Sequence, residues 1–211
     1  MKQSLRILFY LFVFIGFSVC QAGAYEDFFK AVGIDDEGTV QSLLQRGFDP
    51  NSLDPKGQPA LVLALREGSG KVAGRLLEHP DLRVDLANTA DETPLMMAAL
   101  RGNLVVAKKL IERGAALRRD GWTPLHYAAS GPSTPLVEWL LERGAPLEAR
   151  SPNGTTPLMM AARYGPEDSA LALLKHGADP KARNDRDLDA AAFARLGGRE
   201  PLAERLAALR P

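Results

Sequence analysis

The stretch that decides the fold is Thr123-Pro124-Leu125-His126-Tyr127-Ala128-Ala129, and two close copies with the sequence TPLMMAA occupy residues 93–99 and 156–162. A second pattern accompanies it, because six times a helix-like stretch ends 11 residues before a leucine: Val32 to Leu43, Leu65 to Leu76, Ala99 to Leu110, Ala129 to Leu140, Ala162 to Leu173 and Arg195 to Leu206. Self-similarity at a period of about 33 residues is typical of stacked repeats. The sequence therefore predicts a repeat architecture rather than a closed domain.

Each repeat is predicted to contain two helices. Threonine followed by proline begins the first helix, because the hydroxyl can cap a free N–H and proline at the first helical position gives up no hydrogen bond. Gly102 and Gly165 are expected to permit the tight turn between the helices. The second helix is expected to end at a glycine suited to a left-handed cap, in turn Gly114, Gly144 and Gly177.

Polar, turn-rich segments connect the repeats. They include Asp54-Pro55-Lys56-Gly57, Asp120-Gly121, Ser151-Pro152-Asn153-Gly154 and Asn184-Asp185. Since Asp-Gly and Asn-Gly are strong turn signals, each connection is expected to form a hairpin-like finger. One finger is short: 13 residues separate Leu110 from Thr123, against 16 from Leu140 to Thr156.

These motifs resemble those of the ankyrin repeat family. The stretch 123–129 matches the family's T-P-L-H-x-A-A signature, and Leu-Leu-x-x-Gly-Ala recurs at 140–145 and 173–178. The resemblance implies an all-α solenoid of stacked helix-turn-helix units with hairpin-like fingers, over residues 25–211. We expect an N-terminal cap repeat at 25–57, repeats at 58–91, 92–121, 122–154 and 155–186, and a C-terminal cap repeat at 187–211.

Residues 1–24 have the pattern of a secretory signal peptide. Lys2 and Arg6 precede an apolar run of 13 residues over 7–19, and Ala22-Gly23-Ala24 supplies small residues for cleavage. The run is short for a bilayer core of roughly 30 Å. We predict cleavage after Ala24 and a periplasmic or secreted protein. The alternative is a lipoprotein that is cut before Cys20 and tethered to a membrane.

Charge and cysteine content limit the kinds of partner and the covalent cross-links that are expected. The chain has 26 Lys and Arg against 26 Asp and Glu, and removal of residues 1–24 takes away two bases and no acids. Such balance creates no broad field for nucleic acid or an anionic membrane, so neither is expected as a partner of the cleaved protein. Cys20 is the only cysteine, so the remaining chain cannot form a disulfide. We expect a monomer.

No motif in the sequence points to catalysis. It contains no Gly-rich phosphate loop, no nucleophile elbow and no paired histidines at metal spacing. We therefore predict no enzyme, no cofactor and no metal. The ankyrin resemblance implies a structural role for His126, which would hydrogen-bond the capping Thr123 and neighbouring loop backbone.

The position before the Ala-Ala pair is large and apolar in five consecutive units. We call these five residues the apolar stripe: Leu63, Met97, Tyr127, Met160 and Phe193. Stacking is expected to align them on a concave side, flanked by Arg66, Leu100, Arg101, Arg163 and Tyr164. Apolar anchors near arginine and tyrosine are typical of protein-binding surfaces. The alternative is packing between adjacent first helices.

Trp122 is a second candidate for partner contact. It lies between Gly121 and the capping Thr123, at a finger tip where a large aromatic side chain is costly unless something covers it. The alternative is that the short finger folds Trp122 back onto its neighbour.

These features predict a non-catalytic protein–protein interaction module that is exported to the periplasm. Its unidentified protein partner would dock on the concave face and the finger tips. Two alternatives remain: an inhibitor or immunity-type protein that blocks a toxin or hydrolase in the same compartment, and an accessory or protective factor for an exported enzyme.

Overall fold

The computed structural model describes residues 23–209. Every regular element in that range is an α-helix, and the β-type pairing there is an isolated antiparallel bridge between Leu53 and Pro59. The all-α prediction is confirmed. Cys20 and all of the predicted signal segment except Gly23 and Ala24 lie outside the described residues.

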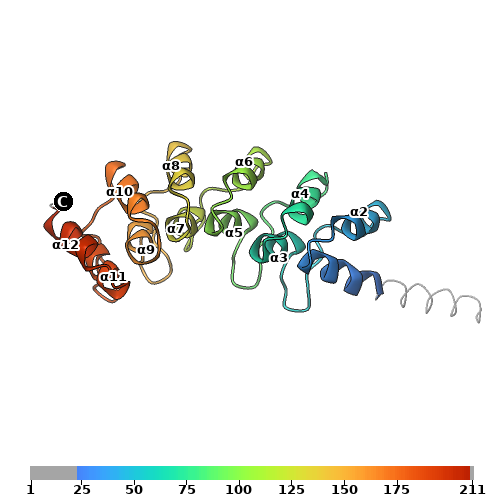
Figure 1. Cartoon of the computed structure of the whole chain (residues 1–211), viewed down its shortest axis with the longest axis horizontal. Helices are drawn as coiled ribbons and strands as arrows, with labels where there is room; N and C mark the ends of the chain where they lie inside the picture. The colour runs from blue at the N-terminus through green and yellow to red at the C-terminus, as the bar shows by residue number, and fades with distance from the viewer. Residues whose placement is uncertain (1–22, 210–211) are drawn as a thin grey trace, which may run out of the picture. The chain divides into compact units, whose positions relative to one another are not determined.

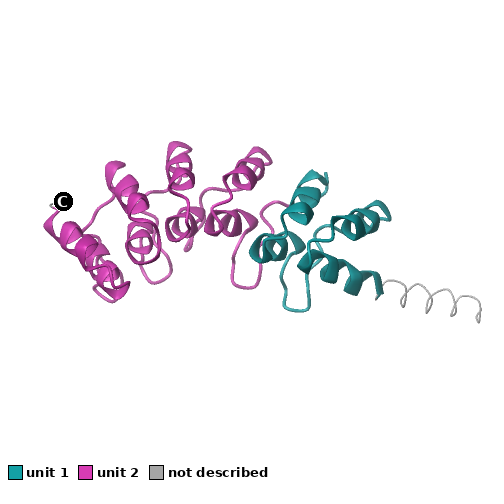
Figure 2. Cartoon of the chain, viewed as in Figure 1, with its two compact units in different colours: residues 1–82 teal, residues 83–211 magenta. Residues whose placement is uncertain are grey.

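The chain divides into two compact units, Met1–Leu82 and Arg83–Pro211, which Figure 2 draws in teal and magenta. We call them unit 1 and unit 2. In unit 1, α4 packs against both α2 and α3. The helices of unit 1 are a helix over residues 23–33, α2 (Glu37–Gln45), α3 (Ala60–Glu67) and α4 (Gly70–Glu78).

Unit 2 contains four helix pairs in series. Its first helices, α5, α7, α9 and α11, pack on one another in order, and each also packs on the second helix of its own pair (Figure 1). The helices are α5 (Pro94–Leu100), α6 (Leu104–Glu112), α7 (Pro124–Ser130), α8 (Thr134–Glu142), α9 (Pro157–Tyr164), α10 (Glu167–Lys175), α11 (Ala190–Leu196) and α12 (Glu200–Ala208). The predicted helix-turn-helix unit is confirmed.

The starts of α5 and α9 explain why methionine can replace histidine in the motif. The hydroxyl oxygens of Thr93 and Thr156 accept hydrogen bonds from the backbone N–H groups of Met96 and Met159, at 3.3 and 3.4 Å. The methionine sulfurs accept in return from the threonine N–H groups, both at 3.4 Å. A thioether sulfur can act as a weak hydrogen-bond acceptor. Each Thr-Met pair therefore forms a reciprocal capping box without histidine.

The leucines of the motif form the core of unit 2. Leu95, Leu125 and Leu158 occupy the same position in three repeats, and all three are fully buried. Each such burial stabilises the fold by about 1.5–3 kcal/mol. The alanines beside them are buried as well, which lets neighbouring first helices lie close together.

The glycines follow the predictions with one correction. Gly114, Gly144 and Gly177 have φ angles of 92°, 80° and 93°, so the predicted left-handed caps are confirmed. Gly102 also has a positive φ, of 68°. Gly165 instead has an extended backbone with φ of −86°, and a Cβ there would lie 2.0 Å from the carbonyl oxygen of Ala129. Close approach between repeats, and not left-handed geometry, requires this glycine.

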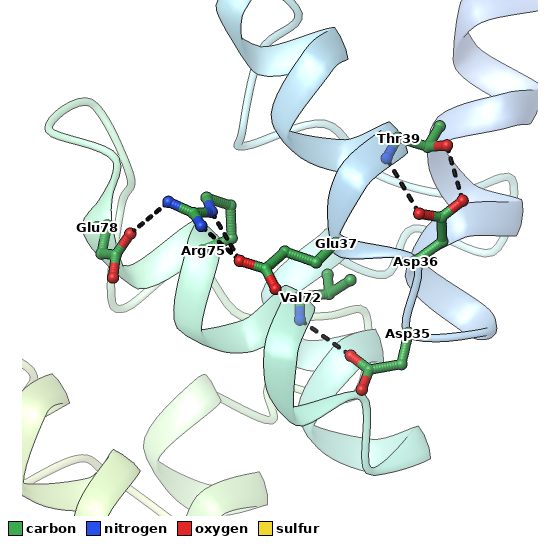
Figure 3. Close-up of polar contacts among 7 residues, drawn as sticks. All are labelled: Asp35, Asp36, Glu37, Thr39, Val72, Arg75 and Glu78. Atoms are coloured by element: carbon green, nitrogen blue, oxygen red, sulfur yellow. Dashed lines mark hydrogen bonds and ion pairs between the residues drawn. The ribbon is translucent and has the colours of Figure 1, made fainter.

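Carboxylates connect the helices of unit 1 (Figure 3). Asp36 caps α2 by accepting from the N–H and hydroxyl of Thr39, at 3.1 and 2.7 Å, and these hydrogen bonds lower the pKa of Asp36. The Asp35 carboxylate accepts from the N–H of Val72 at 2.9 Å, so it caps α4 of the next repeat.

Arg75 on α4 completes this network. Its guanidinium binds Glu37 at the start of α2 and donates to Glu78 at 2.8 Å (Figure 3). The hydrogen bonds that Arg75 donates to the Glu37 carboxylate raise the pKa of Arg75, and the pair connects the two second helices of unit 1.

Candidate protein-binding surface

The apolar stripe is not uniform in exposure. Met97 and Phe193 are only 2% and 7% exposed, as packing between first helices would require, and they offer a partner almost no surface. Tyr127 and Met160 are half-buried in unit 2, and Leu63 is half-buried in unit 1. Packing therefore accounts for two members of the stripe, while partner contact at the other three stays a prediction.

Tyr127 is held by a polar contact at its tip. Its hydroxyl donates to Oε1 of Glu92, at 3.1 Å, near the end of the preceding finger. Burial raises the pKa of Tyr127, and the negative charge of Glu92 adds to the effect. The phenol therefore stays protonated, and its hydroxyl is already engaged within unit 2.

Trp122 packs on its own repeat. Its ring lies edge-on to His126 and to Tyr127, with centroid separations of 5.2 and 6.5 Å. The side chain is half-buried, so part of it remains at the surface. Back-folding thus takes place against the start of α7, and partner contact through the remaining surface stays a prediction.

His126 has the predicted structural role. Its Nε2 lies 2.9 Å from the carbonyl oxygen of Thr155, which can only accept, so Nε2 carries the proton and Nδ1 accepts from Thr123. The ring is fully buried, and burial lowers the pKa of His126 to about 4. The neutral imidazole connects α7 to the following finger.

The residues predicted to flank the stripe differ in their contacts. Arg66 in unit 1 forms an ion pair with Glu67 at 3.6 Å, and Arg101 is exposed at the end of α5. In unit 2 the guanidinium of Arg163 lies 4.9 Å from the ring centroid of Tyr164, which is 56% exposed. This cation–π pair is an accessible aromatic group with adjacent positive charge.

The fingers share a turn that depends on one side chain. Five residues before the first-helix cap, Asp54, Asn88 and Asn184 each accept hydrogen bonds from the N–H groups two and four residues further on. Ser151 accepts from Thr155 in the same way. In these four fingers the residue's own N–H donates to the carbonyl four residues later. The side-chain acceptor thereby stabilises the hairpin-like tip.

The third finger, residues 115–122, departs from this pattern. The equivalent position is Arg118, whose guanidinium has five donors and no acceptor, so it cannot stabilise the turn in this way. Among the described residues, the third finger also lacks the backbone pair found in the other four. The short finger thus has arginine where its neighbours have a turn-forming side chain.

A pocket of about 490 Å³ opens between the third finger and the fourth, residues 145–155. We call it the arginine pocket, because guanidinium groups from both fingers contribute to its walls. It is lined by Arg118, Arg119, Asp120, Gly121, Pro146, Ala149 and Arg150. Sequence reasoning did not identify this pocket, although the Arg118-Arg119 pair at a turn-forming position was a signal that could have found it.

Backbone carbonyls orient two of these arginines. Arg118 donates to the carbonyl of Gly144 at 3.2 Å, and Arg150 donates to the carbonyls of Gly154 and Arg183 at 3.4 and 2.8 Å. Arg119 instead binds Asp91 through an ion pair. The arginine pocket therefore combines three positive side chains with fixed directions.

No group of three or more His, Cys, Asp or Glu side chains within 23–209 is placed to hold a metal ion. No helix in that part of the chain is both long enough and apolar enough to span a bilayer.

A family model described as ankyrin repeats (3 copies) matches residues 28–120 and 115–184. The chain belongs to the ankyrin repeat family. Ankyrin repeat proteins are generally non-catalytic interaction modules, so the family supports the predicted binding of a protein partner.

Ankyrin repeat relatives include much longer proteins. The nuclear factor NF-kappa-B p105 subunit of Gallus gallus is 35% identical over 152 residues, which are 69% of this chain and 16% of that protein. The ankyrin repeat protein nuc-2 of Neurospora crassa is 33% identical over 152 residues, or 70% of this chain and 14% of that protein. In each case the match spans only a small part of the longer protein.

A solved structure matches over nearly its whole length. It is a chain in the complex of the Bd0816 predatory endopeptidase from Bdellovibrio bacteriovorus with immunity protein Bd3460. The TM-score is 0.72 at 27% identity, and the match covers 87% of this ankyrin repeat chain and 98% of that chain.

Proposed function

We propose that this ankyrin repeat protein is an exported, immunity-type inhibitor that binds a hydrolase of the endopeptidase class and blocks it. The observation that carries the proposal is the near full-length similarity to an ankyrin-like chain from an endopeptidase–immunity complex. Relatives that share only a segment with much longer proteins carry less weight for the function of the whole chain.

The surface of unit 2 is suited to such a partner. Half-buried Trp122 and the exposed pair of Arg163 and Tyr164 supply aromatic and guanidinium groups, which are enriched at the energetic centres of protein interfaces. The arginine pocket adds positive charge, and its lining includes Gly121, the residue that precedes Trp122. An inhibitor needs a rigid surface of this kind more than it needs reactive groups.

A direct test measures inhibition. The purified chain is used to capture proteins from the envelope and secreted fractions of the organism that makes it, and captured hydrolases are assayed with increasing amounts of the chain. We expect loss of peptidase activity that is complete near a 1:1 ratio. A captured enzyme that stays fully active would favour the accessory-factor alternative instead.

Matched variants locate the inhibitory surface. Trp122→Ala combined with Tyr164→Ala should weaken inhibition by about 30-fold or more, since loss of a central aromatic anchor costs about 2 kcal/mol. The control is Val105→Ala on α6, because Val105 is 67% exposed and lies outside the proposed surface. Equal effects of both changes would contradict the proposed surface.

Export is a separate part of the proposal, and it rests on the signal pattern of residues 1–24. Mass spectrometry of the protein from its native host should find Tyr25 at the N-terminus, and Cys20→Ser should leave processing unchanged. An N-terminus at a lipid-modified Cys20 would instead establish the lipoprotein alternative.

A further inference from the structure

We propose that the arginine pocket receives an acidic side chain from the protein partner, with Arg118 and Arg150 as its carboxylate-binding groups. The inference rests on the proposed binding function and adds the chemistry of one contact. It assigns the partner an aspartate or glutamate on a segment that enters between the third and fourth fingers.

The charge of the arginine pocket favours an acidic ligand. Three guanidinium groups line the pocket against a single carboxylate, Asp120. Arg119 is matched by Asp91, but Arg118 and Arg150 form no ion pair within the described residues. Two positive charges therefore face the pocket without a carboxylate partner, and an acidic group is complementary to them.

Two guanidinium groups of the arginine pocket are preorganised. Arg118 and Arg150 are held by carbonyl groups of different segments, so each has lost part of its rotamer freedom before a ligand arrives. Each guanidinium still has further N–H groups, and its planar fork matches the two oxygens of a carboxylate. The pocket can therefore bind a carboxylate with little added ordering.

The arginines of the third finger lower the local stability of its turn. The third finger carries arginine where four other fingers carry a side chain that stabilises the turn. In addition, Nε of Arg119 is buried without a protein hydrogen-bond partner among the described residues. Features that oppose local stability tend to occur at functional sites. Here they coincide with the pocket wall.

A titration with defined peptides tests the proposal without the partner. The purified chain is titrated with acetyl-(Glu)4-amide, with acetyl-(Gln)4-amide and with inorganic phosphate, while the arginine Nε–Hε signals are followed by NMR. We expect the Glu peptide to shift the signals of Arg118 and Arg150, and the Gln peptide to leave them unchanged. Tighter binding of phosphate than of the Glu peptide would overturn the assignment.

Variants that are expected to weaken or to tighten binding of the Glu peptide provide a further test. Arg118→Gln or Arg150→Gln should weaken binding of the Glu peptide about tenfold, the usual size for loss of a charge-assisted pair. Asp120→Asn should tighten it about twofold, because a competing surface charge is removed. Arg186→Gln on the next finger is the matched control, since Arg186 is exposed and does not line the pocket. Circular dichroism melting confirms that each variant is folded, and Arg118→Lys tests whether charge alone suffices.

The same variants separate this inference from the proposed function. If Arg118→Gln and Arg150→Gln still inhibit the captured hydrolase fully, the pocket assignment fails and the inhibitory function stands. If the chain inhibits no hydrolase but the Glu peptide binds through Arg118 and Arg150, the pocket stands and the inhibitory function fails.

Discussion

At the residue scale, glycine permits close contact between successive repeats of unit 2. Gly131, Gly165 and Gly197 have ordinary negative φ angles, so backbone conformation does not require glycine at these positions. A Cβ would instead lie 2.7, 2.0 and 2.6 Å from a carbonyl oxygen of the preceding repeat. The missing side chain thus lets two backbones approach each other.

Replacement of Gly165 should therefore be destabilising. Gly165→Ala places a methyl group against the carbonyl of Ala129, and such overpacking costs about 1–3 kcal/mol of unfolding free energy. Urea denaturation measures the change. Gly74→Ala inside α4 is the control, since a Cβ there meets nothing within 4 Å and should stabilise the helix by about 0.5–1 kcal/mol. An unchanged free energy of unfolding for Gly165→Ala would show that the repeats can move apart.

The buried His126 makes stability depend on pH. Its pKa falls from an ordinary value of about 6.5 to about 4 in the folded chain, so protons bind preferentially to the unfolded state. The stabilisation is complete above pH of about 6.5 and declines as pH falls toward 4, by about 3 kcal/mol in total. Urea unfolding of the wild type and of His126→Gln between pH 4 and 7 isolates this contribution. Parallel pH profiles would contradict the prediction.

At the scale of elements, one side chain caps the C-terminal end of α9. Arg199, at the N-cap of α12, donates through one terminal nitrogen to the carbonyls of Ala161, Ala162 and Gly165, at 3.0, 3.0 and 2.7 Å. The last carbonyls of a helix lack partners within the helix and carry negative partial charge. A guanidinium is therefore well suited to connect α9 with the last repeat.

Loss of this contact should loosen the C-terminal repeat. Arg199→Ala is expected to cost about 1.5–3 kcal/mol, the range for hydrogen bonds to a charged group, and to speed amide hydrogen exchange in α11 and α12. The control is Arg195→Ala, which removes an exposed ion pair with Glu200 and should cost less than about 1 kcal/mol. Equal losses from both variants would argue against a special role for Arg199.

At the scale of the whole molecule, unit 2 is a linear series of neighbours. Helix α9 packs on α7 and α11, and α5 packs on α7, so stabilising contacts pass from one repeat to the next. Stability in such arrays is approximately a sum of repeat and nearest-neighbour terms. No disulfide within the described residues reinforces the series, because the only cysteine, Cys20, lies outside them.

Deletion of residues 187–211 tests whether the stability of unit 2 depends on contacts between neighbouring repeats. The deletion removes α11 and uncovers the face of α9 that packs on it, so repeat 155–186 should lose amide exchange protection. Repeats 92–121 and 122–154 should keep theirs, because α5 and α7 do not depend on α11 for their packing. Simultaneous loss of protection throughout unit 2 would instead show a single cooperative unit.

Sequence was sufficient for the repeat and for its helices. The Thr-Pro entry, the Ala-Ala pair and the terminal glycines act through atoms a few residues apart, so their effects follow from local chemistry. The repeated motif 123–129 also placed His126 in its structural role by family resemblance. The same reasoning left the apolar stripe open, because a large residue beside Ala-Ala is compatible with either packing or exposure.

The amino-acid sequence by itself thus determined the ankyrin repeat, its helix pairs and the caps at their ends. Only the tertiary structure decided that Met97 is buried while Tyr164 is exposed, and that Gly165 is needed for close approach. It also brought Arg118 and Arg150 together in one pocket. The reason is physical: these properties depend on distances between segments about one repeat apart, which local propensity and spacing do not specify.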